Sequence, residues 1–184
     1  MIEELDMHLL DLVQNALSAG SSRIDVRVIC DQAADRLTIR VADNGTGMDE
    51  RTLETVQRGY YSSKSEQSVG LGIPLLRETA LHCDGRFAIE SKMGEGTTVT
   101  AEFRKSHIDL PPFGDLVATF LNIIVTADAR YVTITYQCDG NELELDTAAL
   151  SELLGELSFQ HPEVIRFLKA YIAERVNKEV RRTG

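Results

Sequence analysis

Two hydrophobic periodicities alternate along the first hundred residues. Apolar side chains at residues 3–19 recur three and four positions apart and are followed by Gly20, which predicts a first helix capped by a glycine. Apolar and polar side chains alternate at 24–28 and again at 37–41, which predicts two strands. Because only a short polar loop separates them, we expect these strands to pair as a hairpin.

The pattern continues to about residue 104. A short helical or irregular piece is expected at 49–58, and residues 59–69 have so little apolar periodicity that they predict a mobile loop. A helix should begin near Gly72, where Pro74 fits its first turn. Strands at 87–91 and 98–103 would then complete the sheet.

The composition changes near residue 106, because Pro111-Pro112-Phe113-Gly114 stops regular structure. We therefore divide the chain into residues 1–105 and a small C-terminal α/β appendage, residues 106–184, of unassigned role. The appendage is expected to contain a helix, two strands and two helices, at 114–125, 131–137, 142–146, 147–157 and 162–181. For the apolar stripe of the last helix, packing onto its own domain is favoured over a partner or dimer surface.

Charge and hydropathy narrow the function classes. A net charge of −10 on 184 residues argues against general binding to nucleic acid or anionic membrane, but not against a small polyphosphate held by backbone N–H groups. Apolar runs stay shorter than the ~20 residues that cross a bilayer, and the acidic start is unlike a secretory signal. We expect a cytoplasmic protein.

The three cysteines, Cys30, Cys83 and Cys138, are odd in number and far apart in the sequence. No close pair suits zinc or a redox dithiol. We expect them to be small buried apolar side chains.

Four short fragments occur in an order that suggests a binding site. Asn15 follows Asp11 by one helical turn, and the later fragments are Asp43-Asn44-Gly45-Thr46-Gly47-Met48, Gly70-Leu71-Gly72 and Gly94-Glu95-Gly96-Thr97. Each alone is typical of an ordinary turn. All four in order indicate a site for Mg-ATP.

The first helix offers the metal ligand. His8, Asp11, Asn15 and Ser18 share one polar stripe, for which a solvated face is the alternative explanation. An Asn15 side-chain oxygen suits Mg²⁺, which takes further oxygens from phosphates and water. Asp11 would orient or deprotonate a water aimed at the terminal phosphate.

The later fragments offer contacts to the nucleotide. The Asp43 carboxylate would accept a hydrogen bond from the adenine amine, while Gly45 and Gly47 let the backbone approach closely; the alternative is a simple β-turn. Gly70-Leu71-Gly72 precedes a helix whose N-terminal N–H groups suit phosphate oxygens. Lys64 would reach a terminal phosphate, unless it is only solvated.

Together these residues resemble the GHKL superfamily of gyrase, heat-shock chaperone, histidine kinase and mismatch-repair ATPase domains, over roughly residues 5–104. The resemblance implies a two-layer α/β sandwich of the Bergerat type, with a mixed sheet, helices on one face, and ATP between the helix layer and a lid. It also implies roles for single residues: magnesium at Asn15, adenine at Asp43 with Gly45, Gly47 and Met48, phosphates at Gly70, Leu71 and Gly72, and a threonine near adenine at Thr97.

The chain departs from the family pattern at Asp11. Hydrolytic members place Glu there and histidine kinases often place Asn, so the shorter Asp predicts slow hydrolysis, because a shift of about 1 Å can cost about 10²-fold in rate. Residues 60–64 and 70–73 look most like histidine kinases, and residues 15–24 look closer to mismatch-repair ATPases.

No helical hairpin with a phosphoacceptor histidine precedes the domain, so we do not expect a self-contained histidine kinase. None of the four histidines is assigned as a phosphoacceptor. His8 is expected to lie behind the site or to be merely exposed.

Three functions remain open. The leading hypothesis is an ATP-dependent, kinase-like regulatory protein that uses Asp11 and Lys64 in catalysis and passes phosphate, or its nucleotide state, to a separate protein partner. A slow ATPase switch that drives association is the second, and a nucleotide-binding interaction module without turnover is the third. A homodimer is compatible with each of them.

Overall fold

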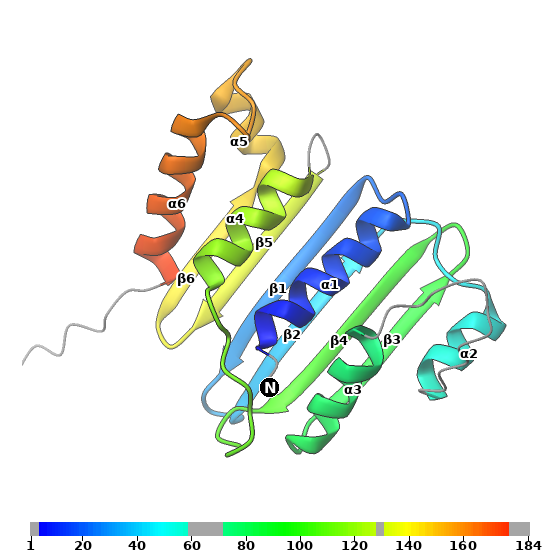
Figure 1. The fold of residues 1–184 in the computed structure, drawn as a ribbon. Coiled ribbons are helices and arrows are strands. Elements are labelled where there is room, and N and C mark those ends of the chain that lie inside the picture. Colours follow the sequence, from blue (N-terminus) through cyan, green and yellow to red (C-terminus); the bar gives the residue numbers. More distant parts are fainter. Residues whose placement is uncertain (1–3, 59–71, 128–130, 177–184) are drawn as a thin grey trace, which may run out of the picture.

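The structure is a computed structural model that describes residues 4–58, 72–127 and 131–176 (Figure 1). Its helices are α1 (Leu5–Ser18), α2 (Glu50–Arg58), α3 (Gly72–His82), α4 (Leu116–Ala127), α5 (Thr147–Leu154) and α6 (Pro162–Val176). Its strands are β1 (Arg23–Asp31), β2 (Arg36–Asp43), β3 (Arg86–Lys92), β4 (Gly96–Arg104), β5 (Tyr131–Cys138) and β6 (Asn141–Asp146). The elements predicted from periodicity are therefore confirmed within the described residues, with shifts of a few residues at their ends.

The strands form one mixed sheet in the order β3-β4-β2-β1-β5-β6. The predicted hairpin of β1 and β2 is antiparallel, with Val26 opposite Val41. β1 and β5 are the parallel neighbours, with Val26 opposite Ile134. The other neighbouring strands pair antiparallel.

One face of the sheet is covered by helices, and α1, α3 and α4 lie across it (Figure 1). Alternate strand residues such as Val26, Ile39 and Ile134 are buried under them. On the opposite face the Asp25 carboxylate accepts hydrogen bonds from Arg40 at 3.0 Å and Thr133 at 2.9 Å. This two-layer arrangement follows from strands that alternate apolar and polar side chains.

The last two strands continue the sheet of the first 104 residues, and α4 packs beside α1. The apolar stripe of α6 is buried against α4 and β6, as expected for packing onto its own chain; it consists of Val164, Leu168, Ile172 and Val176. The division near residue 105 stays a prediction, because a shared sheet does not test whether either part folds alone.

The proline-rich segment 111–115 ties α1 to α4. Leu5 N donates to the Pro112 carbonyl at 2.9 Å, which occupies an N–H group that the start of a helix leaves open. In return, Asp6 on α1 accepts a hydrogen bond from Asp115 N at 3.1 Å, where α4 begins, and another from Thr119 Oγ1 at 3.2 Å. The start of α1 is therefore hydrogen-bonded to the connecting segment, and the start of α4 is hydrogen-bonded to α1 through Asp6.

The expectation of three unpaired buried cysteines is wrong for two of them. Cys30 at the end of β1 and Cys138 at the end of β5 form a disulfide, with Cα atoms 4.7 Å apart. The sequence did not reveal this pair because 108 residues separate the cysteines, and only the parallel pairing of β1 with β5 brings them together. Cys83 is free and buried, as expected.

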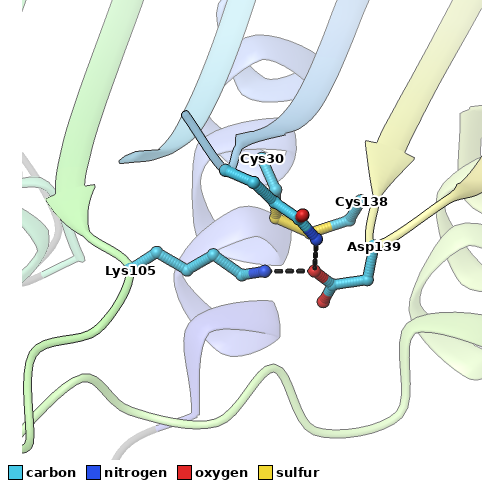
Figure 2. Close-up of a disulfide and its surroundings, with 5 residues drawn as sticks. Cys30, Lys105, Cys138 and Asp139 are labelled. Atoms are coloured by element: carbon cyan, nitrogen blue, oxygen red, sulfur yellow. Dashed lines mark hydrogen bonds and ion pairs between the residues drawn. A yellow bond between two sulfur atoms is a disulfide. The ribbon is translucent and has the colours of Figure 1, made fainter. Parts of the chain in front are cut away.

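The turns around the disulfide are held together as well (Figure 2). Asp139, next to Cys138, accepts hydrogen bonds from Lys105 Nζ and from Gln32 Nε2, the second at 2.9 Å. The hydrogen bond from Lys105, followed by that from Gln32, lowers the pKa of Asp139 below its usual value. This end of the sheet therefore joins β1, β4 and β5.

Candidate functional site

A cavity of about 400 Å³ lies between α1, the end of β2 and the start of β4. Five residues singled out in the sequence line it: Asn15, Asp43, Gly47, Met48 and Thr97. Most of the remaining wall is apolar and consists of Leu12, Ala16, Ala19, Val41, Ile73 and Val99. A mostly apolar cavity of this volume with a few polar groups is typical of a small-molecule site.

Asp43 is the half-buried carboxylate of this cavity. It is the last residue of β2 and lies opposite Thr97 on β4. Its Oδ1 accepts the Gly45 N–H at 2.7 Å. Burial raises the pKa of Asp43 above its ordinary value, although hydrogen bonds from the Gly45 and Thr97 backbone oppose the shift. A carboxylate oxygen among aliphatic side chains suits an amino group on a flat, apolar ring.

The glycines after Asp43 are required by close packing of the chain on itself. A Cβ at Gly45 would lie 2.8 Å from Ala19 Cβ, at the end of α1. Gly47 has φ +63°, and a Cβ there would collide with the carbonyl oxygen of Lys92. Side chains at either position would push the 43–48 loop away from its neighbours.

Asn15 and Asp11 both lie on the exposed side of α1, but in different surroundings. Asn15 lines the cavity, whereas Asp11 is one turn earlier and is not among the lining residues. The Asp11 carboxylate lies beside Gly72, the first residue of α3, where a Cβ would be 2.7 Å from Asp11 Oδ2. The structure therefore places this carboxylate at the N-terminus of the helix that follows the second glycine motif.

His8 is buried, with 2% of its surface exposed. The alternative that His8 is merely exposed is therefore wrong. His8 is buried together with the leucines of α1. The polar character of histidine did not indicate this burial.

Three predicted site residues, Lys64, Gly70 and Leu71, lie outside the residues that the structure describes, as does the predicted loop at 59–69. Their roles stay predictions.

Ser91 on β3 is a residue that the sequence analysis missed. Its Oγ accepts the Met48 N–H at 2.9 Å, donates to the Gly96 carbonyl at 3.0 Å, and lies 2.8 Å from Thr97 Oγ1. One hydroxyl thus links the loop after β2 to the start of β4. In the sequence, only its position three residues before Gly94 could have indicated that Ser91 lies near the site.

Asn44 was quoted within a motif but not given a role. Its Oδ1 accepts hydrogen bonds from Ser22 N at 3.0 Å and Arg23 N at 2.8 Å. The side chain thereby fastens the loop after β2 to the start of β1, which fixes Asp43 and the neighbouring glycines relative to α1.

The described residues contain no group of three or more histidine, cysteine or acidic side chains arranged to hold a metal. A magnesium ion near Asn15 would therefore take most of its ligands from phosphates and water, as this ion commonly does. In the part of the chain that is described, every helix is too short or too polar to cross a bilayer.

Comparison with known proteins identifies a family for the first part of the chain. The sequence profile of the family described as histidine kinase-, DNA gyrase B-, and HSP90-like ATPase matches residues 2–107. Among curated proteins, sensor histidine kinase YvrG of Bacillus subtilis is 30% identical over 101 residues, which cover 53% of this chain and 17% of the relative. A probable C4-dicarboxylate sensor kinase of Halalkalibacterium halodurans is 35% identical over 92 residues, covering 48% of this chain and 17% of that protein.

Among solved structures, the N-terminal domain of a DNA repair protein superposes with a TM-score of 0.51 at 15% identity and covers 78% of this chain and 52% of the other. This likeness shows the fold, a mixed sheet with helices on one face. The kinases are much longer than the matched region, and the family profile ends just after β4. The chain belongs to the histidine kinase-, DNA gyrase B- and HSP90-like ATPase family, with an ATP-binding domain at residues 2–107.

Proposed function

We propose that this chain binds Mg-ATP in the cavity between α1, β2 and β4, and acts as a histidine-kinase-like regulatory protein toward a separate protein partner. The observation that carries the proposal is that Asn15, Asp43 and Thr97, far apart in the sequence, line one cavity. In this proposal the protein works in the cytoplasm, where ATP is supplied.

The adenine ring would enter the apolar part of the cavity. Asp43 Oδ1 already accepts the Gly45 N–H, so Oδ2 would accept the exocyclic amine of adenine. Guanine carries a carbonyl at the equivalent position, and two acceptors facing each other would disfavour it. Thr97, opposite Asp43, would contact the ring from β4.

The phosphates would extend from the cavity toward α3. Asn15 would donate its amide oxygen to Mg²⁺, and the first turn of α3 would supply N–H groups to phosphate oxygens. Lys64, Gly70 and Leu71 are proposed to contact the phosphates as well. A bound Mg²⁺ would also offset the negative charge of Asp11, because that carboxylate lies beside the start of α3.

A test of this proposal follows the terminal phosphate. The purified chain is incubated with γ-labelled ATP and Mg²⁺, alone and with cell extract, and Asn15→Ala is compared with the matched control Gln14→Ala, a neighbouring exposed residue of α1 that does not line the cavity. Label that moves to a protein of the extract with the parent and Gln14→Ala, but not with Asn15→Ala, supports a kinase. If Asn15→Ala binds and transfers as the parent does, the site assignment is wrong.

A second function, a slow ATPase switch, is favoured by the position of Asp11 at the N-terminus of α3. From there its carboxylate would orient a water toward a terminal phosphate bound to that helix. Free phosphate released by the chain alone supports the switch. Nucleotide binding without transfer or release, together with a partner affinity that is the same with and without Mg-ATP, supports instead an interaction module without turnover.

A further inference from the structure

A second cavity, of about 280 Å³, lies between α1 and α4 and is called the α1–α4 groove below. Its apolar lining residues are Met7, Leu10, Val13 and Leu17 on α1 and Ile123 on α4. Val13 and Ile123 are buried, whereas Met7 is 53% exposed. The groove therefore has a buried apolar floor and an accessible apolar side chain on one wall. It shares no lining residue with the proposed nucleotide cavity.

The rims of the α1–α4 groove are polar. Gln14 on α1 and Asn122 and Thr126 on α4 are exposed and line it. A groove between two helices, with an apolar floor and polar rims, matches an amphipathic helix, because the side chains of one helix pack into the groove that its neighbours leave. Proteins commonly recognise the apolar face of a partner helix in this way.

Asp11 connects this groove with the phosphate end of the nucleotide site. Among the described residues, Asp11 is the only charged side chain that lines the groove. Its Oδ2 also lies beside the first residue of α3, where a Cβ on Gly72 would be 2.7 Å away. α3 and α4 flank α1 on the same face of the sheet (Figure 1). A molecule in the groove therefore lies next to the helix terminus at which the terminal phosphate is proposed to bind.

The second wall of the groove lies outside the ATP-binding domain. The family profile ends at residue 107, whereas α4 spans Leu116–Ala127. Asp115 N and Thr119 Oγ1 both donate to Asp6 Oδ2, which holds the start of α4 against α1. The groove is therefore a feature that the C-terminal part of this chain adds to the domain.

We propose that the α1–α4 groove docks an amphipathic helix of the protein partner and brings its phosphate acceptor to Asp11; this inference rests on the proposed function. The apolar stripe of the docked helix packs against Met7, Leu10 and Ile123. An acceptor side chain at its edge donates an N–H or O–H to the Asp11 carboxylate. Residues 106–184 thereby gain a role, because α4 helps to select the partner.

The transfer in this arrangement uses Asp11 as the base. The acceptor atom forms a bond to the terminal phosphorus of ATP. The bond from that phosphorus to the bridging oxygen breaks, and its electron pair leaves with ADP. Asp11 takes the proton of the acceptor.

The experiment follows γ-label from Mg-ATP to a protein of the cell extract, with the full chain throughout. Two substitutions alter the groove: Met7→Gln replaces an apolar side chain with a polar one of similar length, and Thr126→Lys places a long cationic side chain on the opposite wall. The matched controls are Leu153→Gln and Ser151→Lys on α5, which are exposed and line neither cavity. Gln and Lys are good helix formers, so we expect each helix to remain folded.

We expect roughly tenfold slower transfer with both groove variants, because a docked helix loses apolar contact at either wall. Both controls should transfer as the parent does, and the dissociation constant for Mg-ATP should stay at the parental value in all four variants. A photo-crosslinking amino acid in place of Met7 should capture the protein that carries the label, and the same amino acid in place of Leu153 should not.

The outcomes separate this inference from the proposed function. Parental transfer by both groove variants overturns the docking site and leaves the proposed function standing. Absence of transfer by the parent contradicts the proposed function and the docking site with it. The docking site is also overturned if both groove variants lose Mg-ATP affinity as much as transfer, or if position 7 cross-links only to a second copy of the chain.

Discussion

Ser91 on β3 holds Met48, in the loop after β2, in place: its Oγ accepts the Met48 N–H at 2.9 Å while the same hydroxyl donates to the Gly96 carbonyl. Met48 and Thr97 both line the proposed nucleotide cavity, so this hydroxyl fixes two of its walls relative to each other.

Replacing Ser91 with alanine should therefore weaken nucleotide binding without unfolding the protein. A lost hydrogen bond contributes about 1 kcal/mol, which corresponds to about fivefold weaker binding. The measurement is the dissociation constant for Mg-ATP by calorimetry, with Ser151→Ala, an exposed serine of α5, as the control. Equal affinity of both variants and the parent would mean that Ser91 does not position the cavity wall.

Asp43→Asn tests the recognition of adenine. The variant keeps the shape and the acceptor for the Gly45 N–H, but it places an amide where the ligand would find a carboxylate oxygen. Hydrogen bonds to charged groups contribute about 1.5–3 kcal/mol, so we expect roughly 10- to 100-fold weaker ATP binding.

The matched control for this substitution is Asp49→Asn, since Asp49 is exposed and outside the cavity lining. The ratio of ATP to GTP affinity is measured for each protein. A ratio that stays at the parental value in Asp43→Asn would remove Asp43 from base recognition.

Asp11 is tested with two substitutions of opposite effect. If the carboxylate orients the attacking water, Asp11→Asn abolishes phosphate release, while Asp11→Glu lengthens the side chain and raises the slow rate. Because a displacement of about 1 Å can change a rate about 10²-fold, a gain of ten- to a hundredfold is expected for Glu.

Release of phosphate is followed in a coupled assay, and nucleotide affinity is measured in parallel. Asp11 lies beside the proposed position of the phosphates, so the measured ATP affinity separates an effect of each variant on binding from an effect on the rate of release. Unchanged turnover in Asp11→Asn would exclude Asp11 as the base.

Gly47 and Gly94 form a matched pair for testing the loop after β2. Both have positive φ, 63° and 80°, but a Cβ at Gly47 collides with the Lys92 carbonyl whereas a Cβ at Gly94 meets nothing within 4 Å. Alanine at Gly94 should cost only the backbone strain, about 1 kcal/mol.

Alanine at Gly47 should lower the free energy of unfolding by clearly more than alanine at Gly94, because the loop must also move away from β3. Urea unfolding measures both, and calorimetry with Mg-ATP shows whether the shifted loop still binds nucleotide. Equal destabilisation by the two substitutions would mean that the close contact of Gly47 with Lys92 is absent in solution.

Features that depend on neighbouring residues could be predicted from the sequence, whereas contacts between residues far apart in the sequence could not. Helices and strands were predicted because the period of apolar residues is local. The grouping of Asn15, Asp43 and Thr97 at one place was expected from the order of the fragments and the family that they resemble, and all three line one cavity. The parallel pairing of β1 with β5 was not predicted, because no local pattern specifies which edge of a sheet a later strand joins. The disulfide was missed for the same reason.

The hydrogen bond from Thr119 to Asp6 also could not be predicted from the sequence. An acid in the first turn of a helix is normally read as favourable to that helix itself, and only the structure shows that this carboxylate serves the neighbouring α4. For His8 the sequence left two alternatives, a position behind the site or simple exposure, and only the burial seen in the structure excludes the second.

The disulfide between Cys30 and Cys138 gives the last prediction. It joins β1 to β5 across 108 residues of sequence, at the end of the sheet where Lys105 and Asp139 also pair. Closing a loop of about 100 residues restricts the unfolded chain by about 4.7 kcal/mol in the chain-entropy account, so reduction should lower the unfolding temperature markedly.

The pairing of β1 with β5 spans seven residues, so we expect the strands to stay paired without the bond. The proposed nucleotide cavity lies where β2 ends, whereas Cys30 lies near the β1–β2 turn. Nucleotide affinity should therefore change little on reduction, while stability falls. The measurement is thermal unfolding and Mg-ATP calorimetry with and without a thiol reductant, and the double variant Cys30→Ser/Cys138→Ser is the control that reductant must leave unaffected. A reducing compartment keeps thiols unpaired. A large loss of stability would therefore mean that the protein is much less stable in such a compartment than in its oxidised form. No loss would mean that the paired strands and the surrounding hydrogen bonds hold this end of the sheet without the bond.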